Sequence, residues 1–329
     1  MNVLKIAYFG DGLWATKALQ RLIKDGHTIA TVVLRSHPSD QTLIELAKEL
    51  GIDTLQPKRV NADDFSDALN EIGPDLCISM SYDQIIRRRV LEVPRKGFIN
   101  FHAGKLPLYR GRNVINWAII NNETEIGLTA HYLDEGIDTG DIILQKTLPI
   151  EWQDTYSHVL SKVTDGFPAL MSETVRQISD GRAYRRSQSG LQGTYYGRRK
   201  QGDESIDWSK ISLETYNKIQ AITHPGPGAT TELNGNTCIV WTSSYDPSWP
   251  NYVATPGEVI GRIPDAGIMV KSSDSTLLVK SIQMQSNAER VADFPIGTRF
   301  GISLIDEVMS LKNRIDALER EIHAGKISD

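Results

Sequence analysis

Residues 97–141 read GFINFHAGKLPLYRGRNVINWAIINNETEIGLTAHYLDEGIDTGD, and the rest of the chain is organised around this stretch. It opens with an alternating apolar run in which Asn100 and His102 are two residues apart, so their side chains leave a strand on the same face. A second apolar run, at 126–133, ends in a loop rich in aspartate and glycine, at 134–141. If the two strand ends are neighbours, an amide, an imidazole and a carboxylate converge at one edge of a sheet. Such a trio can take up a proton, hold the base in place and stabilise an oxyanion.

Composition is that of a soluble globular protein: 329 residues, 40% hydrophobic and 23% charged, enough for two domains. The net charge of −5 argues against a dedicated nucleic-acid-binding protein, whose surface is usually basic. Cys77 and Cys238 lie far apart in apolar runs and are predicted to be reduced core residues. The N-terminal residues lack the apolar core of a signal peptide, and no window is apolar enough to span a membrane. We therefore expect a cytoplasmic protein with no membrane partner.

The first half of the chain alternates apolar runs with helical patterns, which is typical of βαβ units. It predicts an α/β fold, a Rossmann-like open and mostly parallel sheet with helices on both faces. In such sheets ligands bind at the carboxyl ends of the strands, so Phe9, Met80 and His102 should border one cleft. The predicted strands are 3–9, 29–34, 75–80 and 98–102, and predicted helices include 60–72 and 154–178.

Four regions are predicted along the chain. A catalytic domain spans 1–180, and a linker without periodicity, rich in glycine and arginine, spans 181–204. The arginine clusters of the linker could contact phosphates, or the linker is a solvated connector. Five short apolar runs broken by turns predict a small β-rich, OB-like barrel domain at 205–300.

A C-terminal amphipathic helix is predicted at 301–329. Its apolar residues recur at spacings of four and three over about three heptads. Such a helix either packs back on its own domain or forms a short coiled coil with a second subunit. On the second interpretation the protein is a homodimer.

Residues 10–15, Gly10-Asp11-Gly12-Leu13-Trp14-Ala15, match the Gly-x-Gly-x-x-Ala pattern, which can hold a pyrophosphate at a helix N-terminus. The alternative is a tight strand-to-helix turn that needs glycine for its shape alone. Arg35 stands where a nicotinamide-binding enzyme usually has an acidic residue, so at best a phosphorylated dinucleotide would suit this loop.

The trio in the opening stretch suits acyl transfer to an amine. His102 can accept and return a proton because imidazole titrates near neutral pH. Asn100 offers an uncharged donor to an oxyanion. Asp138 would favour the protonated imidazole and fix the ring, although spacing leaves Asp134 and Asp141 as equal alternatives. This chemistry requires no metal, and no HExxH or CxxC cluster is present, so we expect no metal.

Three motifs carry a resemblance to a known family: NFHAGKLPLYRG at 100–111, GLTAH at 127–131 and GIDTGD at 136–141. Together they resemble the formyltransferases that use 10-formyltetrahydrofolate. These include methionyl-tRNA formyltransferase, glycinamide ribonucleotide formyltransferase and the formyltransferases of nucleotide-linked amino sugars. The resemblance implies that the catalytic asparagine, histidine and aspartate of the family are Asn100, His102 and Asp138. The motifs IDW at 206–208 and PGEVI at 256–260 are similar to the small C-terminal domain of the tRNA and aminoarabinose formyltransferases.

The resemblance also implies where the two substrates bind. The pterin of 10-formyltetrahydrofolate would lie between the loop after the fourth strand and the DTGD loop, against Met80, Ser81, Tyr82, Ile85, Asp138, Asp141 and Ile142. The acceptor would lie on the side of the glycine loop. The expected acceptor residues are Gly10, Gly12, Leu13, Trp14, Lys105, Tyr109, Arg110 and Arg112. Of these, Arg110 and Arg112 are candidates for a pyrophosphate, unless they are surface arginines of a glycine loop.

The tRNA-modifying members carry a basic insertion after the second strand, whereas residues 35–40 here are short and nearly neutral. We therefore predict transfer to a nucleotide-linked amino-deoxy sugar for surface polysaccharide (O-antigen) biosynthesis, with a dTDP-linked 4,6- or 3,6-dideoxy amino sugar favoured. No nucleic-acid partner is expected. The alternatives are a methionyl-tRNA formyltransferase and, from another class, an NADP-dependent reductase or nucleotide-binding module.

Overall fold

The computed structural model describes residues 2–38, 40–284, 287–301 and 304–323. The chain divides into two compact units, residues 1–200 and 201–329. Because they are separate bodies, each unit is described by itself.

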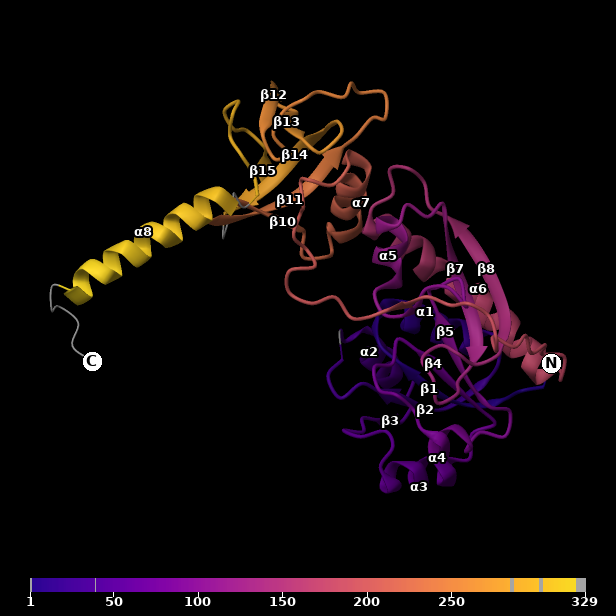
Figure 1. Ribbon diagram of the computed structural model, residues 1–329. Coiled ribbons are helices and arrows are strands. Elements are labelled where there is room, and N and C mark those ends of the chain that lie inside the picture. The colour runs from indigo at the N-terminus through magenta and orange to yellow at the C-terminus, as the bar shows by residue number, and fades with distance from the viewer. Residues whose placement is uncertain (1, 39, 285–286, 302–303, 324–329) are drawn as a thin grey trace. The chain divides into compact units, whose positions relative to one another are not determined.

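The first unit is built on a seven-stranded sheet (Figure 1). The strand order is β3-β2-β1-β4-β5-β7-β8, and the first five strands are parallel. The order reverses between β1 and β4, which is the topological switch point where ligands bind in open α/β sheets. The predicted fold class is confirmed. The strands are β1 (Lys5–Gly10), β2 (Thr28–Leu34), β3 (Thr54–Leu55), β4 (Leu76–Met80), β5 (Phe98–His102), β7 (Glu125–Tyr132) and β8 (Ile142–Pro149).

Helices cover both faces of this sheet, which is why its central strands are apolar on both sides. Phe65 and Val90 pack with Ala7 and Phe9 of β1 on one face. On the other face α6 packs against α1, α5 and β7 (Figure 1). The helices are α1 (Gly12–Lys24), α2 (Thr42–Glu49), α3 (Asp63–Ile72), α4 (Arg88–Leu91), α5 (Val114–Ile120) and α6 (Tyr156–Ser179).

One predicted helix starts later than expected. The pattern at 60–72 predicts a helix from Val60, but α3 begins at Asp63. Val60 N donates instead to the side-chain oxygen of Gln84 over 2.9 Å, so a contact distant in sequence replaces the first helical turn. Asp63 and Asp64 then occupy the first turn, where negative charge is favourable.

The first part of the predicted linker lies on the first unit. Strand β9 (Tyr195–Tyr196) pairs in parallel with β6 (Arg110–Gly111). Ile142 at the start of β8 exchanges two backbone hydrogen bonds with Arg186, each of 2.9 Å. These pairings use the free edges of other segments, which no periodicity within residues 181–200 could indicate.

The second unit is the predicted β-rich domain. Six strands form an antiparallel sheet in the order β10-β11-β14-β13-β12, with β15 beside β14. Its core includes Trp208, Tyr216, Val240 and Phe300. The elements are α7 (Ser212–Ile222), β10 (Ala229–Leu233), β11 (Asn236–Ser244), β12 (Val259–Ile263), β13 (Gly267–Lys271), β14 (Thr276–Met284), β15 (Arg290–Val291) and α8 (Leu304–His323).

Both cysteines are free and buried, as predicted. Burial raises the pKa of the Cys238 thiol to about 11 and that of Cys77 further, so neither is a reactive thiolate. Among the residues that the structure describes, no helix is both long enough and apolar enough to cross a bilayer.

Candidate active site

Strand β7 runs antiparallel to β5. Across the ladder Asn100 pairs with His131, and His102 pairs with Thr129. The end of β7 therefore lies beside the start of β5, so the two strands do not end at the same edge of the sheet. An alternating apolar run has the same period beside a parallel or an antiparallel neighbour, so strand direction could not be read from it.

The loop between β7 and β8 folds back and restores the expected convergence. Tyr132 N donates to the carbonyl of Asp141 over 2.9 Å, which ties the two ends of the loop together. Asp138 lies inside this closed loop in the left-handed region, with φ of +53°. Its carboxylate reaches the neighbourhood of His102, with 3.7 Å between Oδ2 and Nδ1.

The other two aspartates of the loop have different surroundings. Asp134 accepts a 2.7 Å hydrogen bond from the Thr139 hydroxyl of its own loop. Asp141 faces Arg185, at 3.7 Å. Of the three aspartates, Asp138 is the one that lies beside the His102 imidazole. The resemblance implied the same aspartate.

Asp138 has four polar neighbours. Gly111 N donates to its Oδ2 over 2.8 Å. Its Oδ1 lies 3.5 Å from His131 Nε2 and 3.5 Å from Asn100 Nδ2. Burial by itself raises the pKa of this carboxyl, but the charge that His102 can carry, the His131 ring and the Gly111 N–H outweigh burial and hold that pKa well below its usual range. Asp138 is therefore an anion that orients and stabilises its neighbours, and it does not itself exchange a proton near neutral pH.

His102 is buried, and one side of its ring is already committed. Its Nε2 lies 2.6 Å from the Tyr109 carbonyl oxygen. A carbonyl can only accept, so Nε2 carries a proton, and Nδ1, which faces Asp138, is the nitrogen that can take up another. A Cβ on Gly104 would lie 2.5 Å from both His102 Nε2 and Tyr109 O, so the position of the ring depends on that glycine.

His131 is a site residue to which the sequence analysis assigned no role. It is fully buried, and its Nε2 lies 3.1 Å from Asn100 Nδ2. Its Nδ1 lies 2.8 Å from the Tyr132 carbonyl and therefore carries a proton. The Asn100 amide nitrogen thus faces both His131 Nε2, at 3.1 Å, and Asp138 Oδ1, at 3.5 Å, and these two neighbours orient the amide. The available signal was its position in the GLTAH motif, two residues after Thr129 on the same face.

Residues 185–196 border the site from the side of the predicted linker. The pairing of β9 with β6 is so close that a Cβ on Gly111, at φ of +97°, would lie 2.1 Å from the Tyr196 carbonyl. Only glycine fits there, and the same residue supplies the N–H to Asp138. The pairing therefore fixes one of the donors to the Asp138 carboxylate.

Gln188 connects this segment to the aspartate loop. Its buried carboxamide donates to Gly140 O over 2.6 Å and to Asp138 O over 3.1 Å. Its Oε1 accepts from Arg110 Nη2 over 2.8 Å, and Arg110 Nη1 donates to the Tyr195 hydroxyl over 2.8 Å. Arg110, expected at the acceptor pyrophosphate, is thus buried and holds the chain segment beside the site in this structure.

The glycine loop has a carboxylate at its centre. Asp11 is buried, and its Oδ2 lies 2.9 Å from Arg35 Nη1. Arg35 also donates from Nε to the Ser81 carbonyl over 2.7 Å. A Cβ on Gly10 would lie 2.9 Å from the Tyr8 ring, so packing accounts for that glycine. An anion already stands at the start of α1, where the dinucleotide interpretation would place a pyrophosphate.

The remaining residues expected at the acceptor range from buried, at Gly12 and Tyr109, to exposed. Gly12 starts α1 with φ of +82°. Leu13 is exposed, and Trp14 meets Phe167 edge-on with ring centroids 5.7 Å apart. The other three have partners: Lys105 pairs with Glu125, the Tyr109 hydroxyl donates to Glu123, and Arg112 donates to the Asp83 carbonyl.

The four residues expected to contact the donor at the loop after β4 differ in their burial and backbone conformation. Met80 is buried at the end of β4, and Ser81 follows with φ of +63°. The Tyr82 ring packs edge-on against Phe9, and burial raises the pKa of its phenol, so it stays neutral. Ile85 is exposed.

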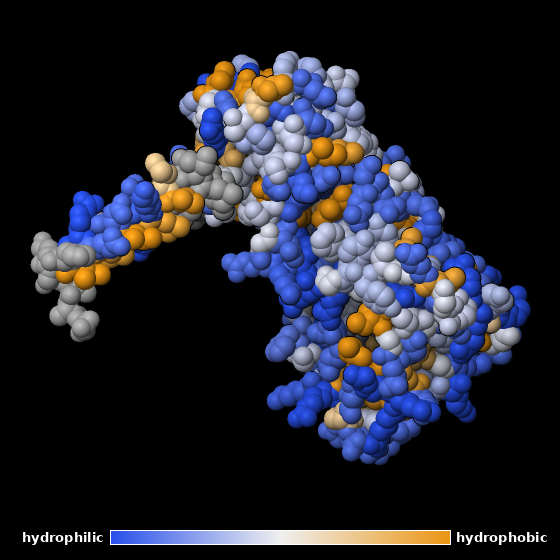
Figure 2. Space-filling view, viewed as in Figure 1, coloured by the Kyte–Doolittle hydropathy of each residue, from blue (hydrophilic) through white to orange (hydrophobic). Residues whose placement is uncertain are grey.

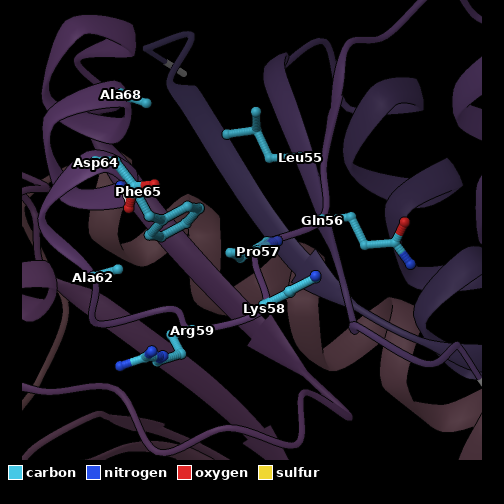
Figure 3. A pocket seen from close by; sticks show the side chains of 9 residues that line it. All are labelled: Leu55, Gln56, Pro57, Lys58, Arg59, Ala62, Asp64, Phe65 and Ala68. Atoms are coloured by element: carbon cyan, nitrogen blue, oxygen red, sulfur yellow. Dashed lines mark hydrogen bonds between the residues drawn. The ribbon is translucent and has the colours of Figure 1, made fainter.

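A hollow of about 710 Å³ adjoins this loop (Figure 3). Its apolar wall includes Phe65, and its polar rim includes Lys58 and Arg59. The segment that forms it is bonded to the donor loop, because Asn61 Nδ2 donates to the Ile85 carbonyl over 2.8 Å. The hollow does not include Asn100, His102 or Asp138.

The site thus joins an amide donor, a buried imidazole and a permanent carboxylate, which defines a site for acyl transfer through an oxyanion. Among the described residues, no group of three or more histidine, cysteine, aspartate or glutamate side chains could hold a metal ion.

Comparison with known proteins shows the family to which this acyl-transfer site belongs. The formyl transferase family model matches residues 4–175, and the model for the C-terminal domain of formyl transferases matches residues 198–297. The chain belongs to the formyl transferase family, and it is an enzyme that transfers formyl groups.

Curated relatives resemble the chain over most of its length. The methionyl-tRNA formyltransferase of Symbiobacterium thermophilum is 32% identical over 315 residues, which cover 91% of this chain and 95% of that protein. The methionyl-tRNA formyltransferase of Geobacter metallireducens is 32% identical over 308 residues, which cover 91% of this chain and 97% of that protein.

Solved structures with the same fold include sugar enzymes. An N-formyltransferase from Helicobacter canadensis, solved with folinic acid and dTDP-3-aminofucose, has a TM-score of 0.67 at 21% identity and covers 86% of this chain and 100% of its own. The sugar 3N-formyl transferase WlaRD, solved with dTDP and 5-N-formyl-THF, has a TM-score of 0.65 at 22% identity and covers 88% and 100%. At these identities the likeness shows the fold.

Proposed function

We propose that the protein transfers the formyl group of 10-formyltetrahydrofolate to the amino group of a nucleotide-linked amino-deoxy sugar. A dTDP-linked 4,6- or 3,6-dideoxy amino sugar is the favoured acceptor, and the product would serve surface polysaccharide (O-antigen) biosynthesis. The observation that carries the reaction class is the convergence of Asn100, His102 and Asp138 at one buried site. We place the enzyme in the cytoplasm, with no nucleic-acid partner.

In the first step the acceptor amine attacks the formyl carbon of the donor. A C–N bond forms, and the carbonyl electrons move to the oxygen, which becomes an oxyanion. Asn100 stabilises this oxyanion by donating an amide hydrogen to it in place of the long, 3.5 Å contact with Asp138. Losing one such donor typically costs about 3–4 kcal/mol.

In the second step the tetrahedral intermediate collapses. His102 accepts the proton that the amine must lose and returns a proton to N10 of the folate as the C–N10 bond breaks. Asp138 stabilises the imidazolium in between. The oxyanion electrons re-form the carbonyl, and the formamido sugar nucleotide and tetrahydrofolate leave, so atoms and charge balance without a further reactant.

The donor is proposed to lie between the loop at Met80, Ser81, Tyr82 and Ile85 and the aspartate loop. Asp141 borders this cleft. Ile142 shapes it from within the core, since its side chain is buried and its backbone is paired. Folate carries glutamate carboxylates, and the positive rim at Lys58 and Arg59 suits that end of the molecule.

The acceptor is proposed on the side of α1, at Gly12, Leu13 and Trp14, with Lys105 and Arg112 near its phosphates. A sugar nucleotide is favoured over tRNA because the segment after β2 is short and nearly neutral, and because the net charge of the chain is −5. The two sugar formyltransferases of like fold support the same choice.

A competition between acceptors tests this proposal. The full chain would be incubated with 10-formyltetrahydrofolate and, separately, with dTDP-, UDP- and GDP-linked amino sugars and charged initiator tRNA. The expected result is a mass gain of about 28 Da, one formyl group in place of hydrogen, on an amino-sugar nucleotide. Formylation of the tRNA alone would overturn the sugar acceptor and leave the formyltransferase chemistry in place.

Methionyl-tRNA formylation is the second candidate. The observation that favours it is the identity of 30% or more to curated methionyl-tRNA formyltransferases along most of the chain. Binding of tRNA rests on many phosphate contacts, so it should weaken steeply with added salt, whereas sugar-nucleotide turnover should change little. We do not propose a reductase, since Asp11 occupies the place of a dinucleotide pyrophosphate.

A further inference from the structure

Helix α8 carries an apolar seam that is half exposed. Its seam residues with described side chains are each between 45% and 62% exposed, and Figure 2 shows the apolar side chains in a row along the helix. They are Val308, Leu311, Ile315, Leu318 and Ile322. A continuous stripe of this kind in water favours a partner that covers it.

The identity of the seam residues points to one kind of partner. Spacings of three and four place Val308, Ile315 and Ile322 at heptad position a, and Leu311 and Leu318 at position d. Position a is thus β-branched throughout, and position d is leucine. This combination favours two parallel strands over trimers and tetramers. We propose that α8 forms a parallel, in-register, two-stranded coiled coil with α8 of a second copy of this chain.

The charges beside the seam agree with the parallel orientation. In a parallel pair, position g of one heptad faces position e of the next heptad on the other helix. Arg314, at g, would then face Glu319 of the partner subunit, at e. In a fully overlapped antiparallel pair, Lys312 would face Lys312 of the partner subunit, and Arg314 would face Arg314 of the partner subunit. Opposite charges therefore meet in one orientation and like charges in the other.

A membrane surface fits this helix less well. Helices that lie on membranes carry mainly lysine and arginine on their polar face. Here Asp316, Glu319 and Glu321 alternate with Arg314 and Arg320. A mixed polar face of this kind is typical of a helix that pairs with another helix.

The test measures mass in solution for the full chain and full-length variants. The wild type is expected to sediment at twice the chain mass of 36.7 kDa at micromolar concentration. Ile315→Lys places a charge in the seam and should raise the dimer dissociation constant by at least about tenfold. Circular dichroism and the thermal midpoint of each variant check that both units remain folded.

A charge exchange separates the two orientations. Arg314→Glu and Glu319→Arg, each alone, should weaken the dimer about tenfold, and the double variant R314E/E319R should restore it to within about threefold. In an antiparallel dimer the double variant restores nothing, because residue 314 still faces its own copy. Val308→Cys adds a second measure, since residue 308 meets its own copy only in the parallel pair and both native cysteines are buried.

The results that overturn the proposal are equally definite. A monomeric wild type at high micromolar concentration removes the self-association. An Ile315→Lys variant that remains dimeric places the interface elsewhere. A dimer without rescue by the double variant and without a 308–308 disulfide removes the parallel orientation. None of these measurements involves formyl transfer, so their outcome is independent of the acceptor.

Discussion

Asp11 is buried and Asp138 is largely buried; both follow a strand of the same sheet, and both face a basic side chain. Asp11 lies 2.9 Å from an arginine, Arg35, which remains charged at every pH at which the protein folds. Asp138 lies 3.7 Å from His102 and 3.5 Å from His131, and imidazole is the side chain that most often acts as a general acid or base. The kind of cation, more than the burial of the carboxylate, separates an aspartate that holds loops together from one that supports chemistry.

The largest loss of kcat is expected for a variant of His102, the residue proposed to accept and return the proton. His102→Asn keeps a similar volume but cannot accept a proton, so kcat should fall by about 10²- to 10⁴-fold. Donor binding, measured by calorimetry with a stable folate analogue, should stay within about threefold of wild type because the variant leaves the donor loop intact. A variant that turns over at the wild-type rate would remove His102 from the mechanism.

Asp138→Asn should lower kcat by about 100-fold, because the imidazolium and the amide donor lose their fixed anion. Single-turnover rates with saturating donor and acceptor measure this loss. Glu135→Gln is the matched control: it makes the same chemical change at an exposed position of the same loop and should leave the rate within about twofold. Equal losses in both variants would mean that loop charge in general, and not Asp138, matters.

Asp11→Asn should affect folding more than rate. It leaves Arg35 with a neutral partner and should lower the free energy of unfolding by about 1–3 kcal/mol, measured by urea titration. The value of kcat, measured well below the unfolding midpoint, should change by less than about threefold. A 100-fold loss of rate at unchanged stability would break the comparison, since Asp11 would then also be a chemical group.

Gln188→Ala should lower kcat by about five- to tenfold, because it removes the amide that fixes the backbone of Asp138 and Gly140. The KM values should change less than kcat, since Gln188 positions a catalytic group and contacts no substrate. Ser189→Ala, at the exposed neighbouring position, is the control. A loss confined to KM would assign Gln188 to substrate binding instead.

The smallest effect concerns stability and pH. The pKa of Asp138 is depressed in the folded protein, so its anion stabilises the fold fully above the unfolded value of about 4, and this contribution is lost as pH falls toward the folded value. The difference in unfolding free energy between wild type and Asp138→Asn should be constant from pH 7 to about 5 and should narrow below about 4. A difference that widens on acidification would contradict the depressed pKa.

Local sequence pattern predicted five strands of the seven-stranded sheet, β1, β2, β4, β5 and β7, but not β3 or β8. The period of two at 98–102 and the apolar runs at 75–80 and 126–133 arise from burial on the sheet. The direction of β7 was not predictable in this way. It depends on which neighbour the strand finds, and that choice is made by tertiary packing.

The roles of two site residues could not be predicted from the sequence, for a different reason. Gln188 lies in an aperiodic segment whose structure consists of pairing with β6, a strand of two residues. His131 was visible in a motif, but its role follows from facing Asn100 across the ladder. Asp138, in contrast, could be selected from three aspartates, because the family motif distinguishes what spacing cannot.

The pairing of β5 with β7 limits which changes in chain length the enzyme can tolerate. Thr129 and His131 face the site, whereas the alternate residues of the strand, Leu128 and Ala130, face away from it. A single residue gained or lost within β7 would turn the strand over and exchange the two sets, so the site would receive leucine and alanine in place of threonine and histidine. Length variation among descendants of this chain should therefore collect in its surface loops, and β7 should change only by substitution.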